Sequence, residues 1–450
     1  MHVRVVVIGG GLGGLSASIA LAGNGFQVSL HEKAPRLGGR ATSYVLPDGE
    51  PIDNCQHVTL GCCVNLQDFY SRIGAADKIR YFDRLLFADS SGRRAEIKLS
   101  GLPAPFHLVP SFTSFRLLTL KDRLAIARAM LRIIASGGRP RLPAMASMMD
   151  WLKLQRQTPK AIDRFWRTVL VSALNEDLDR IDARYGIDVF WKAFVSNPAG
   201  FRVGLPAVPL AELYDASRDR LDQVQTRCGA AEILFGGDAV TGVRLDDGRE
   251  VNADYYIAAV TIDRLLKILP EAVRGQDPFA NLHKLKSSPI TSVHLWFDRP
   301  VMRERFMASL DQTIQWVFNR TGEYLQIVIS ASRGLVQRSQ EQIVDLCRSE
   351  LAKLIPETVK AELKRAIVVR ENAATFSPEP GCDRWRPSQR TRFRNLFLAG
   401  DWTETGWPAT MEGAVRSGYL AAEGILAAEG APLRLVKDDL PATGLARWFG

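Results

Sequence analysis

Glycines near the N-terminus of this chain have the spacing of a phosphate-binding turn. The apolar run of residues 5–8 leads directly into residues 9–14, which read G-x-G-x-x-G. In such a turn Gly9 permits the tight bend, Gly11 lets the backbone approach a pyrophosphate, and Gly14 lets a helix pack closely on the strand. We therefore expect a dinucleotide to bind at these positions: Gly9, Gly11, Leu12, Gly13 and Gly14. Glycine-rich turns also occur for packing alone, so the motif needs support from its neighbours.

The elements that must position these glycines form a β-α-β unit. Residues 15–22 predict a helix that ends at Gly23 to Gly25, and residues 26–30 predict the second strand. Glu32 follows at the position where an acidic residue binds the nucleotide ribose. With strand, helix and acid in register, the dinucleotide site is favoured over the packing alternative.

Composition and cysteine usage set the class of protein. A chain of 450 residues with 46% hydrophobic residues can bury a large core. No apolar run is long enough to span a bilayer, and the first one is cut by glycines before it could act as a signal peptide. The six cysteines lack metal-type spacing and fit a reducing compartment, so we expect a cytoplasmic protein without a metal site.

The net charge of +9 is compatible with nucleic acid, an anionic membrane surface or an ordinary soluble surface. No nucleic-acid-binding module is recognisable, so we expect no nucleic-acid partner. Residues 120–134 could form an amphipathic helix with one apolar stripe: Leu120, Leu124, Ala127, Leu131 and Ile134. Basic residues surround that stripe: Lys121, Arg123, Arg128 and Arg132. We expect this segment to touch the inner face of the plasma membrane and to admit substrate, although a packed helix with a basic solvent face is an equal alternative.

The chain divides by pattern into two interleaved domains. Three ranges predict a nucleotide-binding domain: 1–75, 205–285 and 371–430. Two more predict a substrate domain, 76–204, which is mostly helical in pattern, and 286–370, with 431–450 as a tail. Residues 239–245 and 251–257 flank a turn and predict a hairpin, which leads into a strand at 257–260 that rejoins the sheet. Strands at 291–297 and 324–329 and a helix at 339–354 predict a sheet with one buried face and one face lining a cavity that suits a lipid.

Residues 32–40 resemble the E-x-x-x-x-x-G-G-R signature of the flavin amine oxidase and phytoene desaturase superfamily. The resemblance implies an α/β fold, with a Rossmann-like FAD-binding domain interleaved with an α+β substrate domain. It also implies contacts to FAD from residues spread over the chain: Glu32, Lys33, Gly39, Arg40, the backbone at Cys228, Gly400, Asp401, Thr410 and Met411.

Three further blocks, at residues 52–63, 101–112 and 407–413, resemble the squalene-associated FAD-dependent desaturase family, which includes hydroxysqualene dehydroxylases. The resemblance implies reductive removal of an allylic hydroxyl from hydroxysqualene, a C30 isoprenoid, to give squalene for hopanoids. Reduced flavin would deliver the hydride, and a protonated group must assist the leaving oxygen. His57 is the expected proton donor because imidazole titrates near neutral pH, and Asp53 would orient it or replace it. In the alternative, His57 bonds only FAD or backbone.

The sequence leaves other functions open. A carotenoid-type desaturase would use the same flavin and pocket in the oxidative direction. A flavin amine oxidase is disfavoured because residues 291–294 lack the lysine expected in the substrate-domain strand. A flavin-binding scaffold that contacts squalene-pathway synthases is a third alternative. With no second glycine motif on a strand-to-helix turn, either NADPH or another protein would reduce the flavin.

Overall fold

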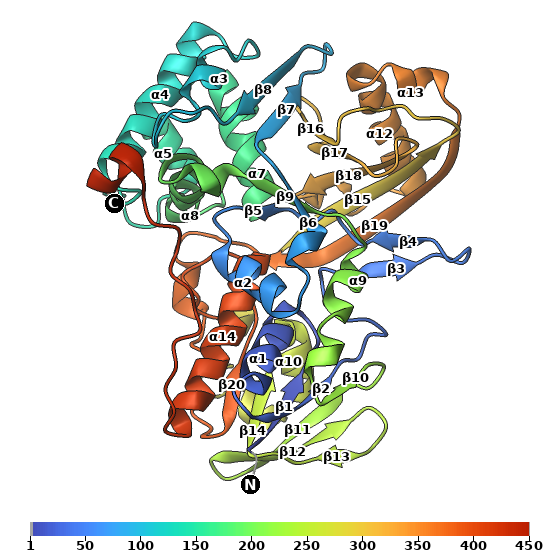
Figure 1. Ribbon diagram of the computed structural model, residues 1–450, viewed down its shortest axis with the longest axis vertical. Helices are drawn as coiled ribbons and strands as arrows, with labels where there is room; N and C mark the ends of the chain where they lie inside the picture. Colours follow the sequence, from blue (N-terminus) through green and yellow to red (C-terminus); the bar gives the residue numbers. More distant parts are fainter. Residues whose placement is uncertain (1–2, 450) are drawn as a thin grey trace.

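The computed structural model describes residues 3–449, and a parallel five-stranded sheet forms its nucleotide-binding end (Figure 1). The strand order is β10 (Gln223–Gln225), β2 (Gln27–His31), β1 (Arg4–Ile8), β14 (Tyr255–Ala258) and β20 (Leu396–Leu398). Every neighbouring pair is parallel. The sheet thus joins strands from both ends of the chain and from its middle.

Alternation along β1 explains how both faces of this sheet are covered. Val5 and Val7 pack with α1 (Leu12–Ala22) and α14 (Met411–Ala428). Val6 and Ile8 belong instead to a core cluster with residues of β11 (Ala230–Gly236), β12 (Ala239–Leu245) and α10 (Ile262–Ile268). Because both faces are buried, residues 5–8 of β1 and all of β14 and β20 are apolar without interruption, as is typical of parallel sheets.

The predicted hairpin needs a correction. β12 matches residues 239–245, but its partner β13 is only Glu250–Val251. The strand expected to rejoin the sheet at 257–260 is present, but it begins two residues earlier: Tyr255–Ala258 pairs with β1 as β14. The apolar run Tyr255 to Ala258 is better buried between two strands of the parallel sheet than at the edge of a meander, and this decides where it goes.

A second, seven-stranded sheet forms the substrate end. Its order is β19 (Leu363–Phe376), β15 (Ser287–Phe297), β18 (Tyr324–Ser330), β17 (Trp316–Asn319), β16 (Phe306–Ser309), β7 (Arg84–Ala88) and β8 (Arg94–Lys98). α12 (Gln340–Leu354) packs on one face, where Ile343 and Leu351 join the cluster that contains Val293 and Ile327. The expected strands at 291–297 and 324–329 and the helix at 339–354 are therefore present in the structure.

Helices fill most of the segment between 109 and 195. They are α3 (Val109–Thr113), α4 (Leu120–Ala135), α5 (Met148–Leu154), α7 (Thr168–Leu174) and α8 (Ala183–Phe190), with π-helical turns at Ile162–Arg167 and Trp191–Val195. The prediction that residues 76–204 are mostly helical missed the strands at its two ends: β6 (Ile79–Phe82), β7, β8 and β9 (Val203–Pro206). β9 pairs with β6 and with β5 (Thr59–Leu60), in contacts too distant along the chain for local pattern to reveal.

A buried histidine in β15 makes the fold sensitive to acid. His294 is fully buried, and its Nδ1 lies 2.7 Å from the hydroxyl of Tyr324. Burial, assisted by the charge of Arg320, lowers the pKa of His294 from 6.5 to about 3. The unfolded chain binds a proton there below pH 6.5 and the folded chain does not, so stability is lost as the pH falls from 6.5 toward 3.

We expect His294→Gln to flatten this pH dependence, because the amide keeps a polar group at the site and does not titrate. Between about pH 7 and pH 5 the free energy of unfolding of the unmodified chain should fall by about 2 kcal/mol more than that of the variant. Urea unfolding at the two pH values measures the difference. The exposed His283, changed to Gln, is the control. Identical pH dependence in His294→Gln and the unmodified chain would contradict the assignment.

Candidate active site

A cavity of about 580 Å³ extends from the glycine turn after β1 to the seven-stranded sheet. Thirteen of the predicted site residues line it: Gly9, Gly11, Leu12, Gly13, Glu32, Lys33, Gly39, Arg40, His57, Gly400, Asp401, Thr410 and Met411. Gly14, Asp53 and Cys228 are not among its lining residues. No residue of 120–134 lines it either, so the substrate entrance expected at that helix stays a prediction.

The glycine turn leaves room for a pyrophosphate. A Cβ built on Gly11 would meet only the Cα of Gly39, at 3.8 Å, so a side chain there would project into the cavity. The N-terminus of α1 is directed there as well, and neither a side-chain cap nor an acidic residue occupies its first turn. Backbone N–H groups of a helix start, with its partial positive charge, suit a phosphate. This end of the cavity therefore fits the pyrophosphate of FAD.

Gly14 has the packing role that its position predicted. A Cβ there would lie 2.0 Å from the carbonyl oxygen of Gly9, so only glycine allows the helix to turn back onto the strand. Gly9 itself has φ of +107° and would direct a Cβ to within 2.5 Å of the Ala259 carbonyl oxygen.

Glu32 closes the nucleotide end of the cavity, directly after β2. Its carboxylate accepts hydrogen bonds from the amides of Gly10 and Ala34, both at 2.6 Å. These bonds fix the carboxylate at the cavity wall, where the ribose hydroxyls of a nucleotide would meet it. Cys228 donates its amide to the Glu32 carbonyl at 3.0 Å and lies behind this wall. Gly229 and Ala230 line the cavity in its place.

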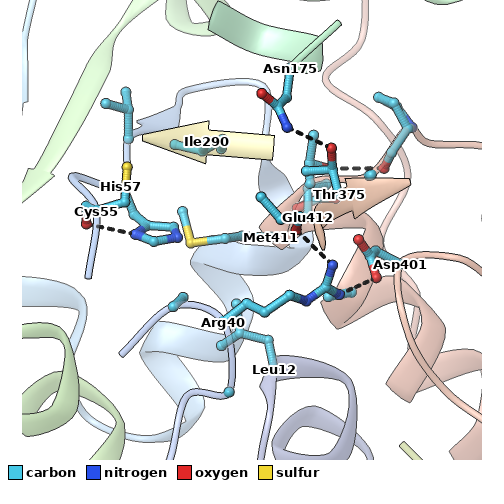
Figure 2. Close-up of a pocket in the computed structure, with 18 of the residues that line it drawn as sticks. Leu12, Arg40, Cys55, His57, Asn175, Ile290, Thr375, Asp401, Met411 and Glu412 are labelled. Carbon is cyan, nitrogen blue, oxygen red and sulfur yellow. Dashed lines mark hydrogen bonds and ion pairs between the residues drawn. The ribbon is translucent and has the colours of Figure 1, made fainter. Parts of the chain in front are cut away.

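Arg40 and Asp401 join the two ends of the chain inside the cavity. The guanidinium pairs with the Asp401 carboxylate and also donates to the Ala374 carbonyl at 2.8 Å (Figure 2). Burial opposes the charged form, but the carboxylate of Asp401 outweighs it and raises the pKa of Arg40. A fixed positive charge at this point would face the phosphates or ribityl chain of FAD.

The start of α14 supplies the last part of the cofactor site. Thr410 is its N-cap and accepts a hydrogen bond from the Gly413 amide at 3.1 Å. The amides before Gly413 stay available to an oxygen of a ligand. Glu412 is fully buried and accepts the amides of Asn65 and Leu66, at 3.2 and 2.8 Å, which fixes α14 against α2 (Val64–Arg72).

The far wall of the cavity is one face of the seven-stranded sheet. Most of its lining residues occupy alternate positions on six strands: Leu85, Ile290 and Ser292, Phe306, Trp316 and Phe318, Val328 and Ser330, and Val369 and Glu371. Ala374 and Thr375, near the end of β19, line the cavity as well. Alternation of strand side chains places the intervening residues, such as Val293 and Ile327, against α12. This wall is therefore predominantly apolar, with four polar positions.

His57 projects into the cavity from the segment after β4 (Pro51–Asp53), and Figure 2 shows its ring directed toward Met411. Nδ1 lies 2.9 Å from the carbonyl oxygen of Cys55, which fixes that nitrogen as the N–H donor. Burial lowers the pKa of His57, against the opposing effects of the Cys55 carbonyl and Asp53. The imidazole is therefore neutral near pH 7, with Nε2 as an acceptor.

Asp53 has a different place from the one expected. Its carboxylate accepts Ser43 Oγ at 2.8 Å, the Leu210 amide at 2.9 Å and the Arg320 guanidinium at 3.0 Å. Its side chain is 1% exposed and no hydrogen bond to His57 is present among the described residues. These partners use the carboxylate fully, so Asp53 positions the segment that carries His57.

Two residues that shape the site could not be found from local sequence patterns. Arg320 follows β17 and donates to Gln56 Oε1 at 2.6 Å as well as to Asp53, so it holds the His57 segment from both sides. Asn175, in a left-handed conformation with φ of +52°, donates to Thr375 Oγ1 at 2.9 Å and accepts the Ala331 amide (Figure 2). Both contacts join segments more than 150 residues apart.

Comparison with known proteins agrees with this geometry. The family model for flavin containing amine oxidoreductases matches residues 12–426. The chain belongs to this family. FAD is accordingly its cofactor and the protein is an FAD-dependent oxidoreductase.

Individual relatives of this oxidoreductase have low sequence identity to it. 15-cis-phytoene desaturase of Solanum lycopersicum is 26% identical over 94% of this chain and 78% of the relative. Zeta-carotene desaturase of Synechocystis sp. is also 26% identical, over 94% and 97% of the two chains. An oxidoreductase from Methanosarcina mazei has the same fold, with a TM-score of 0.72 at 18% identity over 92% of this chain and 98% of the other.

We expect Gly11→Val to abolish retention of FAD while the chain stays folded. The Cβ has space, but the rest of the side chain would occupy the pyrophosphate position. The absorbance of purified protein near the flavin bands, together with circular dichroism, measures both properties. Gly14→Val is the matched comparison, since its Cβ collides with Gly9 and should lower the yield of folded protein instead. Full FAD occupancy in Gly11→Val would refute this placement of the cofactor.

Proposed function

We propose that this oxidoreductase acts on a long polyisoprenoid. The observation that carries the proposal is the apolar face of the seven-stranded sheet, continuous with the cofactor end of the cavity. Helical residues extend the apolar wall: Val169, Leu174, Val189, Phe194 and Phe201. A cavity walled in this way binds hydrocarbon by excluding water from it.

An amine is a poor match for this wall. An amine oxidase is expected to carry a lysine in this strand. β15 instead presents Ile290 and Ser292 to the cavity, in agreement with the absence of lysine from residues 291–294. Lys192 does line the cavity, but its ammonium is already paired with Asp188 at 3.0 Å and Asp439 at 3.3 Å. These contacts support a hydrocarbon substrate over an amine.

Desaturation is the reaction that the relatives favour. Phytoene desaturase and zeta-carotene desaturase, as their names state, desaturate carotenoids, and both match 94% of this chain. Bound FAD would accept or donate the hydride. For desaturation, the protein's own part is to hold the chain extended along the sheet face and to exclude water.

A second candidate is reductive dehydroxylation of hydroxysqualene, favoured by the sequence blocks at 52–63, 101–112 and 407–413. The first and third blocks meet at the cavity, where His57 faces Met411 (Figure 2). The leaving hydroxyl requires a proton. Since Nδ1 of His57 is committed to the Cys55 carbonyl, Nε2 is the atom that would carry it.

The direction of the reaction can be decided with two substrates in parallel under anaerobic conditions. Oxidised enzyme with phytoene should give a dehydrogenated polyene and bleach the flavin if desaturation is correct. Reduced enzyme with hydroxysqualene should give squalene and restore the flavin absorbance if dehydroxylation is correct. Product analysis by mass spectrometry distinguishes the two. Turnover of neither, with turnover of an amine, would reject the polyisoprenoid proposal.

The proton-donor role of His57 predicts an unusual pH profile for dehydroxylation. Because its pKa is lowered, the protonated fraction increases as the pH falls below 7, and the rate should rise by up to about tenfold per pH unit. His57→Gln should remove that rise and lower the rate by about a hundredfold while FAD is retained. His283→Gln, on the surface, should behave as the unmodified enzyme. Loss of FAD from His57→Gln would identify His57 as a cofactor residue.

A further inference from the structure

The apolar stripe of α4 points outward. Leu120, Leu124 and Leu131 are 65%, 62% and 60% exposed, whereas the face that packs on the protein presents Ile126 and Ile133. A packed amphipathic helix would bury its leucines, so this helix has a second apolar face that the chain itself does not cover. No helix in the described part of the chain is long and apolar enough to cross a bilayer.

Two neighbouring segments extend the exposed apolar surface. The loop before α3 exposes Leu102 and Phe106, and Arg123 of α4 donates to the Thr113 carbonyl at the end of α3. The C-terminal turn Gly444–Trp448 is joined to this loop by a hydrogen bond from the Leu445 amide to the Ala104 carbonyl, at 2.8 Å. In that turn Trp448 is 73% exposed.

These three segments, which we call the docking face, lie at one corner of the molecule together with α5 (Figure 1). The docking face comprises the outer side of α4, the loop 101–109 and the turn 444–449. It is distinct from the cavity, because none of these residues lines it.

The stretch of sequence that contains α4 and the loop 101–109 carries most of the net charge of the protein. Residues 101–160 contain ten Lys and Arg and two Asp and Glu, a net charge of +8, while the whole chain carries +9. One of the two acids, Asp122, is buried and completes the capping box of α4 with the N-cap Thr119. The remaining 390 residues are therefore almost neutral in sum. Lys121, Arg128 and Arg132 are exposed on α4 beside the leucines.

We propose that the docking face binds the surface of an anionic lipid bilayer. Exposed leucines surrounded by basic residues fit the acyl and headgroup layers of such a surface. An exposed tryptophan at the margin is the side chain that favours the membrane interface. A nucleic acid would use the positive charge but would leave the leucines without a partner. The proposal does not depend on which polyisoprenoid the enzyme acts on.

Sedimentation of the FAD-bound protein with vesicles tests the docking face. The unmodified protein should sediment with phosphatidylglycerol-containing vesicles at low salt, and weakly with pure phosphatidylcholine vesicles or at high salt. Two triple variants separate the contributions of charge and apolar area: Lys121, Arg128 and Arg132 to Glu, and Leu120, Leu124 and Leu131 to Ser. Each should lower the vesicle partition coefficient by about tenfold or more, with FAD content unchanged.

The matched control carries the same change of charge elsewhere. Arg348, Lys353 and Lys360 are exposed on and near α12 and α13 (Glu357–Lys360), away from the docking face (Figure 1). Changing these three to Glu should leave vesicle binding within about twofold of the unmodified protein. Equal loss of binding in this control, or no binding by the unmodified protein, would overturn the proposal. Stronger binding to duplex DNA than to anionic vesicles would also overturn it.

Discussion

The close approach of α1 to α14 is the contact on which the cofactor site depends. A Cβ on Gly418 would lie 2.1 Å from Ser16 Oγ and 2.2 Å from the Gly13 carbonyl oxygen, so the two backbones meet without a side chain between them. Ser16 Oγ also donates to the carbonyl of Val415, at 3.2 Å. Segments about 400 residues apart are thereby held with both helix N-termini at the same cavity. Each terminus alone would give half of a flavin site.

Buried charge fixes the turn that connects β20 to α14. Arg386 is 5% exposed and donates to the carbonyls of Asp401, Thr403 and Trp407 at 3.1, 2.6 and 2.8 Å. Carbonyl oxygens in a buried turn need donors, and one guanidinium supplies several of them. Removal of such a group would leave these carbonyls unpaired, which costs about 1–3 kcal/mol for each. Asp401 is held from its backbone side by Arg386 and from its side chain by Arg40.

The parts of this protein that could be predicted from its sequence are those with a local physical signature. The glycine turn, Glu32 and the start of α14 are short patterns whose geometry follows from backbone sterics and helix ends. The strands predicted at 291–297 and 324–329 were found for the same reason, since side-chain alternation is visible in a short window. The exposure of the α4 leucines could not be predicted from the sequence. The helix has two apolar faces, and only the fold determines which one is covered.

The remaining features depend on contacts between residues far apart in the sequence, which a short sequence window does not contain. Residues 255–258 leave the hairpin because β1 offers them a buried place in the parallel sheet. Asp53 was expected to act beside His57. Its carboxylate is instead paired with the guanidinium of Arg320, which lies 267 residues further along the chain. A carboxylate near a histidine in sequence has the right composition for a catalytic pair, yet a buried carboxylate is stable only where its oxygens are satisfied. Here the satisfying groups come from β3 (Ser43–Val45), α9 (Leu210–Asp215) and the turn after β17.

In the seven-stranded sheet, the residues that stabilise the core and the residues that line the cavity lie on opposite faces. On β15, Val293 and Leu295 pack against α12, while Ile290 and Ser292 face the cavity. A shift of one residue in register would exchange the two sets, so the buried set fixes the register and with it the cavity wall. Cavity-facing side chains can then change without disturbing the core on the other side of the sheet. The cavity wall beyond the cofactor is therefore free to vary, while the cofactor end is held by backbone contacts between α1 and α14.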